Sequence, residues 1–210
     1  EEALKTNPQA CPGFQAAAVP LLGSHAKARA VPILLTIARG TGDLKLRLTA
    51  SKRLGEQHRE QVTDELLKIY DADQTKEIRA QILRALVESR TQRGSAKIIE
   101  IARAGTDLNS RQTAIRYIAG LRDAASLDEL IRLYDTDKTR EIRIQIIRSL
   151  GERDDPRARA KILDIAKTGE TPELRIEAIR RLADHGRISM DDLLQIYSTE
   201  TDPKIKQGLL

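Results

Sequence analysis

Five cationic residues recur at a spacing of thirty-two, and their type and spacing suit the binding of negatively charged groups. We call this set the outer column: Lys52, Arg84, Arg116, Arg148 and Arg180. If each residue occupies the same place on a repeated helix, the five charges stack along one surface. A stack of cations can meet a phosphate backbone or an acidic peptide.

Acidic residues follow most of the outer column after four residues: Glu56, Glu88, Glu152 and Asp184, with Gly120 interrupting the series. Four residues make about one helical turn, so each carboxylate is placed to neutralise its cation. A salt-bridged, solvated face is the simpler interpretation, and a groove for an acidic partner is the functional one. Arg116 lacks the acid and is followed by Tyr117, so we expect such a groove to centre there, with Arg84 beside it.

Residue sets for catalysis, metal binding or cofactor binding are not recognisable. His25, His58 and His185 lie far apart without recurring acidic or thiol neighbours, as scattered surface histidines do. Cys11 is alone, so no intrachain disulfide can form. We find no Ser/His/Asp or Cys/His set and no glycine-rich phosphate loop. We therefore expect a protein that is not an enzyme and that uses no metal or cofactor.

A second set of cations, five residues before the first, indicates the elements that position both. We call it the ladder column: Arg47, Arg79, Arg111, Arg143, Arg175 and Lys206. Four residues before each stands an N-cap residue type, in the order Asp43, Thr75, Asp107, Thr139, Thr171 and Asp202. Pro172 and Pro203 follow two of these, and proline suits the first position of a helix. Each ladder residue is thus predicted to lie in the first turn of a helix.

Apolar residues predict a further helix before each of these. One apolar column reads Leu34, Leu66, Ile98, Leu130, Ile162 and Leu193, and two others follow it. Such spacing is the buried stripe of an amphipathic helix. At ~100° per residue the ladder column falls at the margin of the second helix's core face, and the outer column points away from it. We expect Ser126 with Glu129 as a capping box, and Asp155 and Ser189 as N-caps.

A 64-residue period lies over the 32-residue one. Tyr70, Tyr134 and Tyr197 stand where the other units have alanine, so bulky and small units alternate. We interpret the tyrosines as packing residues and not as a ligand cage. Charge alternates in another column: Arg39, Asp71, Arg103, Asp135 and Lys167. We expect these residues to pair with one another across unit boundaries.

Composition agrees with a helical array. The 210 residues are 40% hydrophobic but only 2% aromatic, which favours an aliphatic helix–helix core. No apolar stretch approaches the ~20 residues that span a bilayer. We predict an all-α, right-handed α-solenoid of about six two-helix repeats. Residues 26–210 form one continuous array after a degenerate half-repeat at 1–25, and we expect the array to be cut from a longer chain.

The units resemble HEAT repeats, in which an arginine early in the second helix follows an aspartate by six residues. The matching residues are Asp73 with Arg79 and Asp137 with Arg143, and Glu200 with Lys206 is a variant. The unit length is similar to the short bacterial form, the PBS-lyase HEAT-like repeat, over residues 26–210. The resemblance implies that the Asp–Arg ladder ties turns to adjacent helices. It also implies that the second helices, with the outer column, line a concave face.

These features favour a scaffold that binds a protein or peptide partner, possibly an acidic one, on the concave face. Nucleic-acid binding is the alternative that the net charge of +5 favours. The acidic residues beside the outer column and the scarcity of aromatic residues count against it. A bilin lyase or a DNA glycosylase is implied only by the family resemblance.

Overall fold

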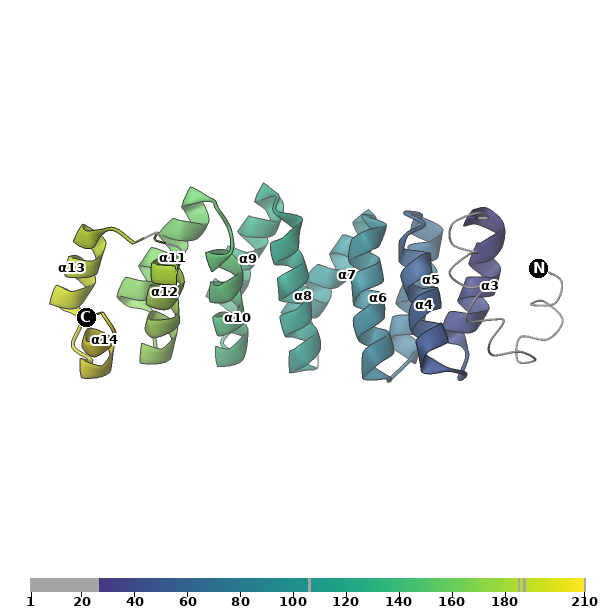
Figure 1. Ribbon diagram of the computed structural model, residues 1–210, viewed down its shortest axis with the longest axis horizontal. Helices are drawn as coiled ribbons and strands as arrows, with labels where there is room; N and C mark the ends of the chain where they lie inside the picture. Colours follow the sequence, from purple (N-terminus) through teal and green to yellow (C-terminus); the bar gives the residue numbers. More distant parts are fainter. Residues whose placement is uncertain (1–26, 106, 185, 187, 210) are drawn as a thin grey trace. The chain divides into compact units, whose positions relative to one another are not determined.

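The computed structural model describes residues 27–105, 107–184, 186 and 188–209. These residues form twelve α-helices and no strand (Figure 1): α3 Lys27–Arg39, α4 Leu44–Gly55, α5 Glu60–Ala72, α6 Lys76–Ser89, α7 Gln92–Ala104, α8 Leu108–Leu121, α9 Ala124–Thr136, α10 Arg140–Gly151, α11 Pro156–Thr168, α12 Pro172–Asp184, α13 Met190–Thr199 and α14 Pro203–Gly208. The predicted degenerate half-repeat at 1–25, with Cys11 and His25, lies outside the described residues, as does His185.

Consecutive helices pair into six repeats, from the first (α3–α4) to the sixth (α13–α14). This confirms the predicted all-helical array of two-helix units. The chain divides into two compact units, Glu1–Glu100 and Ile101–Leu210, and the division falls within α7. Each unit is described separately below.

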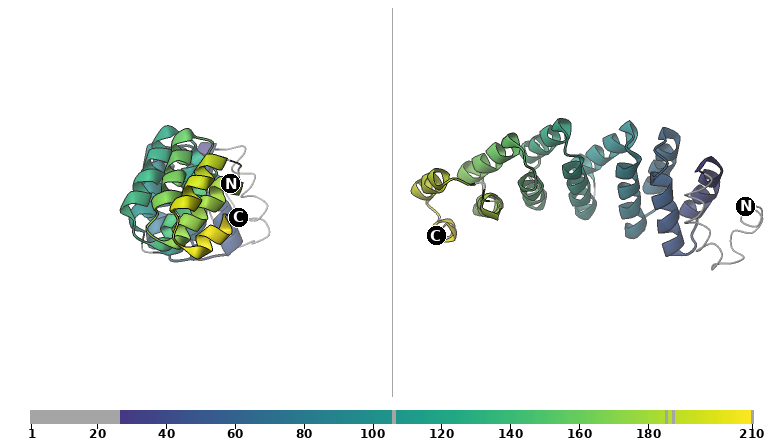
Figure 2. Two further views of the ribbon diagram at one scale, coloured as in Figure 1. Left: turned by 90° about the vertical axis from the view of Figure 1, so that its left-hand side faces the viewer. Right: turned by 45° about the horizontal axis from the view of Figure 1, so that its top comes forward.

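Within each unit the first helices of the repeats form one layer and the second helices the other (Figure 2). In the first unit α3 packs on α5 and α4 packs on α6. In the second unit α9 packs on α11, while α8, α10, α12 and α14 follow one another in the second layer. Equivalent residues on successive second helices are therefore neighbours within a unit.

The core is aliphatic, as the composition predicted. Leu34, Leu66 and Leu130 of the first apolar column are completely buried. Alanine and tyrosine alternate in one buried column, with Ala102 between Tyr70 and Tyr134. Large side chains thus face small ones in successive layers, which fills the interior without voids. The interpretation of Tyr70 and Tyr134 as packing residues is confirmed.

One glycine sets a close helix approach. A Cβ built on Gly55 would lie 2.7 Å from the Ala85 backbone, so α4 and α6 can pack this closely only with glycine there. Outer-column residues of these two helices are therefore held on tightly packed neighbours.

The predicted helix starts are mostly confirmed. Asp43, Asp107, Asp155 and Ser189 each accept a hydrogen bond from a backbone amide of the first turn. The predicted capping box of Ser126 with Glu129 is wrong. Asp123 caps α9 instead, accepting from the Ser126 amide at 2.7 Å, because the helix begins two residues earlier than the pattern indicated.

Non-glycine residues with left-handed backbone end two of the second helices. Arg90 and Arg122 are the C-cap residues of α6 and α8, with φ of 51° and 55°. Gly186 adopts the same conformation 64 residues after Arg122. A side chain is strained in this region and glycine is not.

Candidate interaction surfaces

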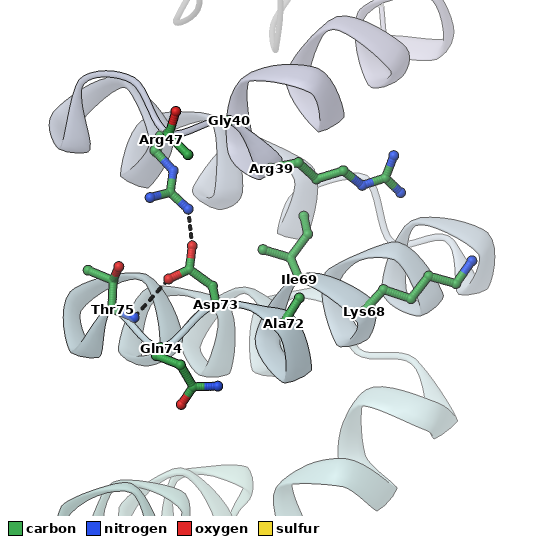
Figure 3. Close-up of a pocket in the computed structure, with 10 residues that line it drawn as sticks. Arg39, Gly40, Arg47, Lys68, Ile69, Ala72, Asp73, Gln74 and Thr75 are labelled. Atoms are coloured by element: carbon green, nitrogen blue, oxygen red, sulfur yellow. Dashed lines mark hydrogen bonds and ion pairs between the residues drawn. The ribbon is translucent and has the colours of Figure 1, made fainter.

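The ladder column is built into the junctions between repeats. Arg47 of the first repeat pairs with Asp73 of the second and also donates to the Ala38 carbonyl at 3.3 Å (Figure 3). Arg111 pairs with Asp137 in the same way. The ladder is therefore real, but the predicted partners within one repeat, Asp73 with Arg79, are wrong. The acid six residues before a ladder cation serves the preceding repeat's cation, because stacking brings the turn of one repeat against the second helix of the one before.

A third junction follows the same rule with a different acid. Arg175 of the fifth repeat donates from Nε to Glu200 of the sixth at 3.1 Å. Glu200 is the residue that the sequence had assigned to Lys206, so this predicted pair is also replaced by one between repeats. All three odd repeats thus reach forward to an acid of the next even repeat.

The carboxylates of these rungs are held as anions. Asp137 accepts a bond from the Thr139 amide at 2.7 Å in addition to its pair with Arg111. Burial raises its pKa, but the Thr139 and Arg111 hydrogen bonds outweigh burial and hold the pKa below its ordinary value. Burial, the Thr75 hydrogen bonds and Arg47 act likewise on Asp73, whose pKa is also lowered.

In the even repeats the ladder cations lie over tyrosine rings. The guanidinium of Arg79 lies 4.5 Å from the ring centre of Tyr70, and that of Arg143 lies 5.1 Å from Tyr134. Lys206 lies 5.2 Å from Tyr197. The sequence analysis missed these cation–π contacts. Their signal was the constant spacing of nine residues between tyrosine and cation, with the 64-residue period.

Arg143 has partners that Arg79 lacks. It donates to the Asp137 carbonyl oxygen at 2.6 Å and to Glu170 of the next repeat at 2.8 Å. Arg79 has a long bond to Gln74 at 3.4 Å, and its Nε is buried without a hydrogen-bond partner. The confirmed expectation is that ladder cations lie at the core margin: Arg47 and Arg143 are buried.

The alternating charges of the first helices pair differently from the prediction. They do not pair with one another but with residues of the next repeat: Arg39 with Glu65, Asp71 with Lys97, Arg103 with Glu129, Asp135 with Lys161 and Lys167 with Asp192. The partner lies 25 or 26 residues onward instead of 32. Neighbouring first helices are thus matched about six residues out of register. The bidentate pair of Arg103 with the buried Glu129 has bonds of 2.7 and 2.6 Å.

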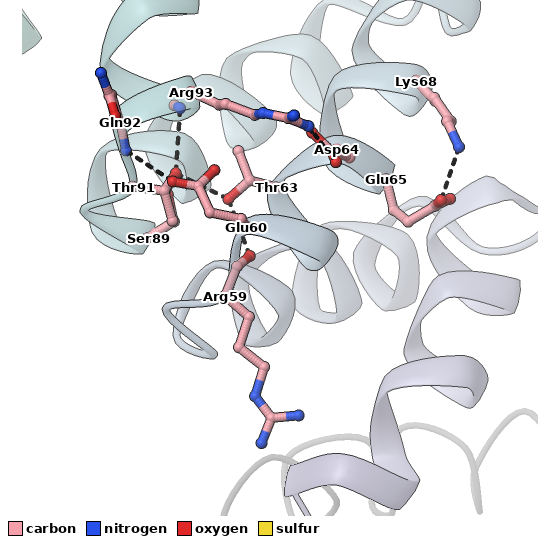
Figure 4. Close-up of polar contacts among 11 residues, drawn as sticks. Arg59, Glu60, Thr63, Asp64, Glu65, Lys68, Ser89, Thr91, Gln92 and Arg93 are labelled. Atoms are coloured by element: carbon pink, nitrogen blue, oxygen red, sulfur yellow. Dashed lines mark hydrogen bonds and ion pairs between the residues drawn. The ribbon is translucent and has the colours of Figure 1, made fainter.

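The junction from the second to the third repeat shows a further set of polar contacts (Figure 4). Arg93 pairs with Asp64, and the Thr63 and Thr91 hydroxyls lie 3.0 Å apart. Glu60 accepts from the Gln92 amide at 3.0 Å. Arg157 pairs with Asp128 at 2.8 Å at the equivalent junction of the second unit. At these junctions the even repeat supplies the acid and the odd repeat the cation.

A hollow of about 780 Å³ lies beside the first rung of the ladder (Figure 3). Its lining includes Arg39, Arg47, Lys68 and Asp73. Arg47 is paired with Asp73, while Arg39 and Lys68 share Glu65. These cations are already neutralised, so the hollow offers little charge to an anionic ligand.

All five residues of the outer column are exposed, as predicted. Lys52 and Arg84 belong to the first unit, and Arg116, Arg148 and Arg180 to the second. Arg148 and Arg180 share the buried carboxylate of Glu177, at 2.9 and 3.5 Å. Among the described residues, Lys52, Arg84 and Arg116 form no ion pair; Arg116 bonds only the Thr113 hydroxyl, at 3.0 Å.

The acids four residues after the outer column do not neutralise it. Glu56 pairs with Arg53, and Asp184 pairs with Arg181. Neither Glu88 nor Glu152 forms an ion pair within the described part of the chain. The interpretation of one-turn salt bridges is therefore wrong.

The acid that matters stands 29 residues after its cation, on the next second helix, where Glu177 meets Arg148. The residue in the same place after Arg116 is Gln145, which carries no charge and donates to Ser149 at 3.4 Å. Arg116 is thus left unneutralised by Gln145 and not by Gly120. Tyr117 next to it is half-buried.

Two general searches of the described residues add limits. No group of three or more His, Cys, Asp and Glu side chains there is arranged to hold a metal ion. None of the described helices combines the length and the apolar character needed to cross a membrane.

Comparisons with known proteins identify part of the chain. Residues 95–183 match the family model for HEAT repeats, which confirms the predicted resemblance for this segment. No curated protein matches the sequence. A solved structure of human deoxyhypusine hydroxylase in complex with glycerol is similar at 16% identity and a TM-score of 0.45, over 96% of this chain and 78% of that chain.

Proposed function

We propose that the protein is a non-enzymatic scaffold that binds an acidic protein or peptide on the exposed side of its second helices. HEAT repeats in residues 95–183 support the scaffold, since repeat arrays present extended surfaces for binding. The observation that carries the proposal is Arg116, an exposed cation on α8 without an ion pair among the described residues. Its neighbours in the outer column, Arg148 and Arg180, are occupied by Glu177.

Anion binding at Arg116 follows from elementary electrostatics. An exposed arginine that already pairs with an acid must lose that partner before it binds another carboxylate. Arg116 has no such partner to lose, and its planar guanidinium can bind a carboxylate through two hydrogen bonds. The net charge of +5 favours encounter with an acidic partner.

Fluorescence anisotropy with a labelled oligoglutamate peptide tests the proposal. Gln145→Glu places an acid where Glu177 meets Arg148, so we expect it to weaken peptide binding about tenfold. Glu177→Gln releases Arg148 and Arg180, so we expect tighter binding. Gly120→Glu adds the same charge as Gln145→Glu at a place whose equivalent, Glu152, forms no ion pair, and we expect a smaller loss.

Arg116→Glu gives the direct loss, and Arg159→Glu on α11 changes the same charge at another exposed arginine. We expect the first to abolish measurable binding and the second to leave it nearly unchanged. Equal binding by all five variants would show that the outer column is a solvated face. Nucleic-acid binding is the second candidate, which the net charge favours. Preferential binding of a DNA duplex, with a steep dependence on salt, would support it instead.

A further inference from the structure

One face of α13 exposes apolar side chains. Met190, Leu194 and Tyr197 are 69%, 59% and 38% exposed. Their spacing of four and then three residues places them on one stripe of the helix. α13 lies next to α11 in the second unit, where Lys167 donates to Gln195 at 2.7 Å (Figures 1 and 2).

The equivalent stripes of the other even repeats are covered. In the fourth repeat Leu127 is fully buried and Tyr134 is 7% exposed. The helix that packs there is α11, the first helix of the next odd repeat. In the second repeat Tyr70 is 4% exposed, and the equivalent of Met190 is the buried Thr63, which meets Thr91 (Figure 4). The stripe on α13 is therefore of a kind that an odd-type first helix covers.

Charge specifies the covering helix further. Asp64 and Asp128 pair with Arg93 and Arg157 of the covering helices. Asp191 holds the same place on α13, is exposed and forms no ion pair among the described residues. A covering helix that brings an arginine to this place would repeat the contact already made at two junctions.

The tyrosine ring indicates a second cation. Tyr134 lies between Arg143 of its own repeat and Lys161 of the covering helix, with ring distances of 5.1 and 5.3 Å. Tyr197 has Lys206 of its own repeat at 5.2 Å and no second cation within the described residues. Arg157 and Lys161 are four residues apart, so one helix face delivers both charges.

We propose that the face of α13 formed by Met190, Asp191, Leu194 and Tyr197 docks a basic amphipathic helix of a partner protein. The partner helix places an arginine against Asp191 and a lysine one turn later over Tyr197. Its aliphatic residues cover Met190 and Leu194. This site is separate from the outer column, and the acidic partner proposed above is of the opposite charge.

A peptide with the sequence of residues 156–168 tests the docking, because it carries the required charges and aliphatic residues. A hydrocarbon staple across the exposed positions 160 and 164 keeps it helical, since short isolated helices are marginal. We titrate it into the isotopically labelled full chain and follow backbone amide NMR shifts. The expected result is saturable shifts confined to α13 and α14.

Three controls decide the outcome. Asp191→Lys should weaken peptide binding about fivefold, and so should reversing both peptide charges with Arg157→Glu and Lys161→Glu. Leu194→Asp should abolish binding; both chain variants alter exposed residues, and circular dichroism checks that they remain folded. Equal affinity of the charge-reversed peptide, shifts at Leu127 and Tyr134 instead of α13, or no shifts at millimolar peptide would each overturn the proposal. So would self-association of the chain in sedimentation that Leu194→Asp removes, because the occupant would then be a second copy.

Discussion

Arg111 and Arg116 lie five residues apart on α8 and are used in opposite ways. Arg111 pairs with Asp137 and donates to the carbonyls of Ala102 and Arg103 at 3.1 and 3.3 Å. Arg116 is exposed and bonds only the Thr113 hydroxyl. Five residues on a helix turn the side chain by ~140°, from the margin of the core to the solvent. Position on the helix, and not residue type, separates the cations that hold the array together from those free to bind.

Acid should give the largest effect, because it reaches all rungs at once. Besides burial, which raises them, hydrogen bonds and arginine partners hold the pKa values of Asp73, Asp137 and Glu200 below their ordinary values. Groups with a lowered folded pKa stabilise the fold fully above their unfolded pKa of ~4. This stability is lost as the pH falls through the folded pKa. Urea unfolding followed by circular dichroism should show a falling midpoint below pH ~4.

The two arginines of α8 provide the control for the acid experiment. Arg111→Ala removes the partner that lowers the pKa of Asp137. We expect it to flatten the acid limb of the stability profile, while Arg116→Ala leaves that limb unchanged. An identical profile in Arg111→Ala would contradict the assignment of the acid limb to the ladder.

Single substitutions at neutral pH test the comparison directly. Arg111→Ala should lower the free energy of unfolding by about 2–4 kcal/mol, because Asp137 is left nearly buried without its countercharge. Arg116→Ala should change it by less than about 0.5 kcal/mol, as is usual at exposed positions. Urea titrations of the two variants measure both. Similar losses would mean that both columns stabilise the array.

The even repeats provide an intermediate case. Arg143→Ala should cost about 1–3 kcal/mol, since the Asp137 carbonyl loses its charged donor and Tyr134 loses its cation. Arg79→Ala should cost about 1 kcal/mol or less, because its main contact is the Tyr70 ring. Thermal unfolding of both variants measures the order. A larger loss for Arg79→Ala would show that cation–π contacts outweigh the hydrogen bonds.

The smallest effect concerns the arginine that ends the same helix. Arg122 has φ of 55°, where glycine has no Cβ penalty. Arg122→Gly should therefore raise the free energy of unfolding by up to about 1 kcal/mol. Arg116→Gly, inside the helix, should lower it by about 1 kcal/mol. A destabilised Arg122→Gly variant would show that the arginine side chain contributes more than the strained backbone costs.

Much of the fold was predictable because it depends on local patterns. The caps Asp43 and Asp107, the buried Leu66 and Leu130, and the alternation of Tyr70 with alanine all follow from helix periodicity and helix-start chemistry. Of the candidate site, the exposure of the outer column was predictable for the same reason. Its neutralisation was not, because Glu177 reaches Arg148 from another helix.

The sequence alone determined which residues form each helix, which face is buried and which cations reach solvent, since these depend on rotation about one helix axis. The tertiary structure decided the partners. Asp73 meets Arg47 and not Arg79, Glu129 meets Arg103 and not Ser126, and Gln145 and not Gly120 leaves Arg116 unneutralised. Each of these depends on the register between packed repeats, about six residues out of step on the first helices. Side-chain packing sets that register, and no single repeat contains it.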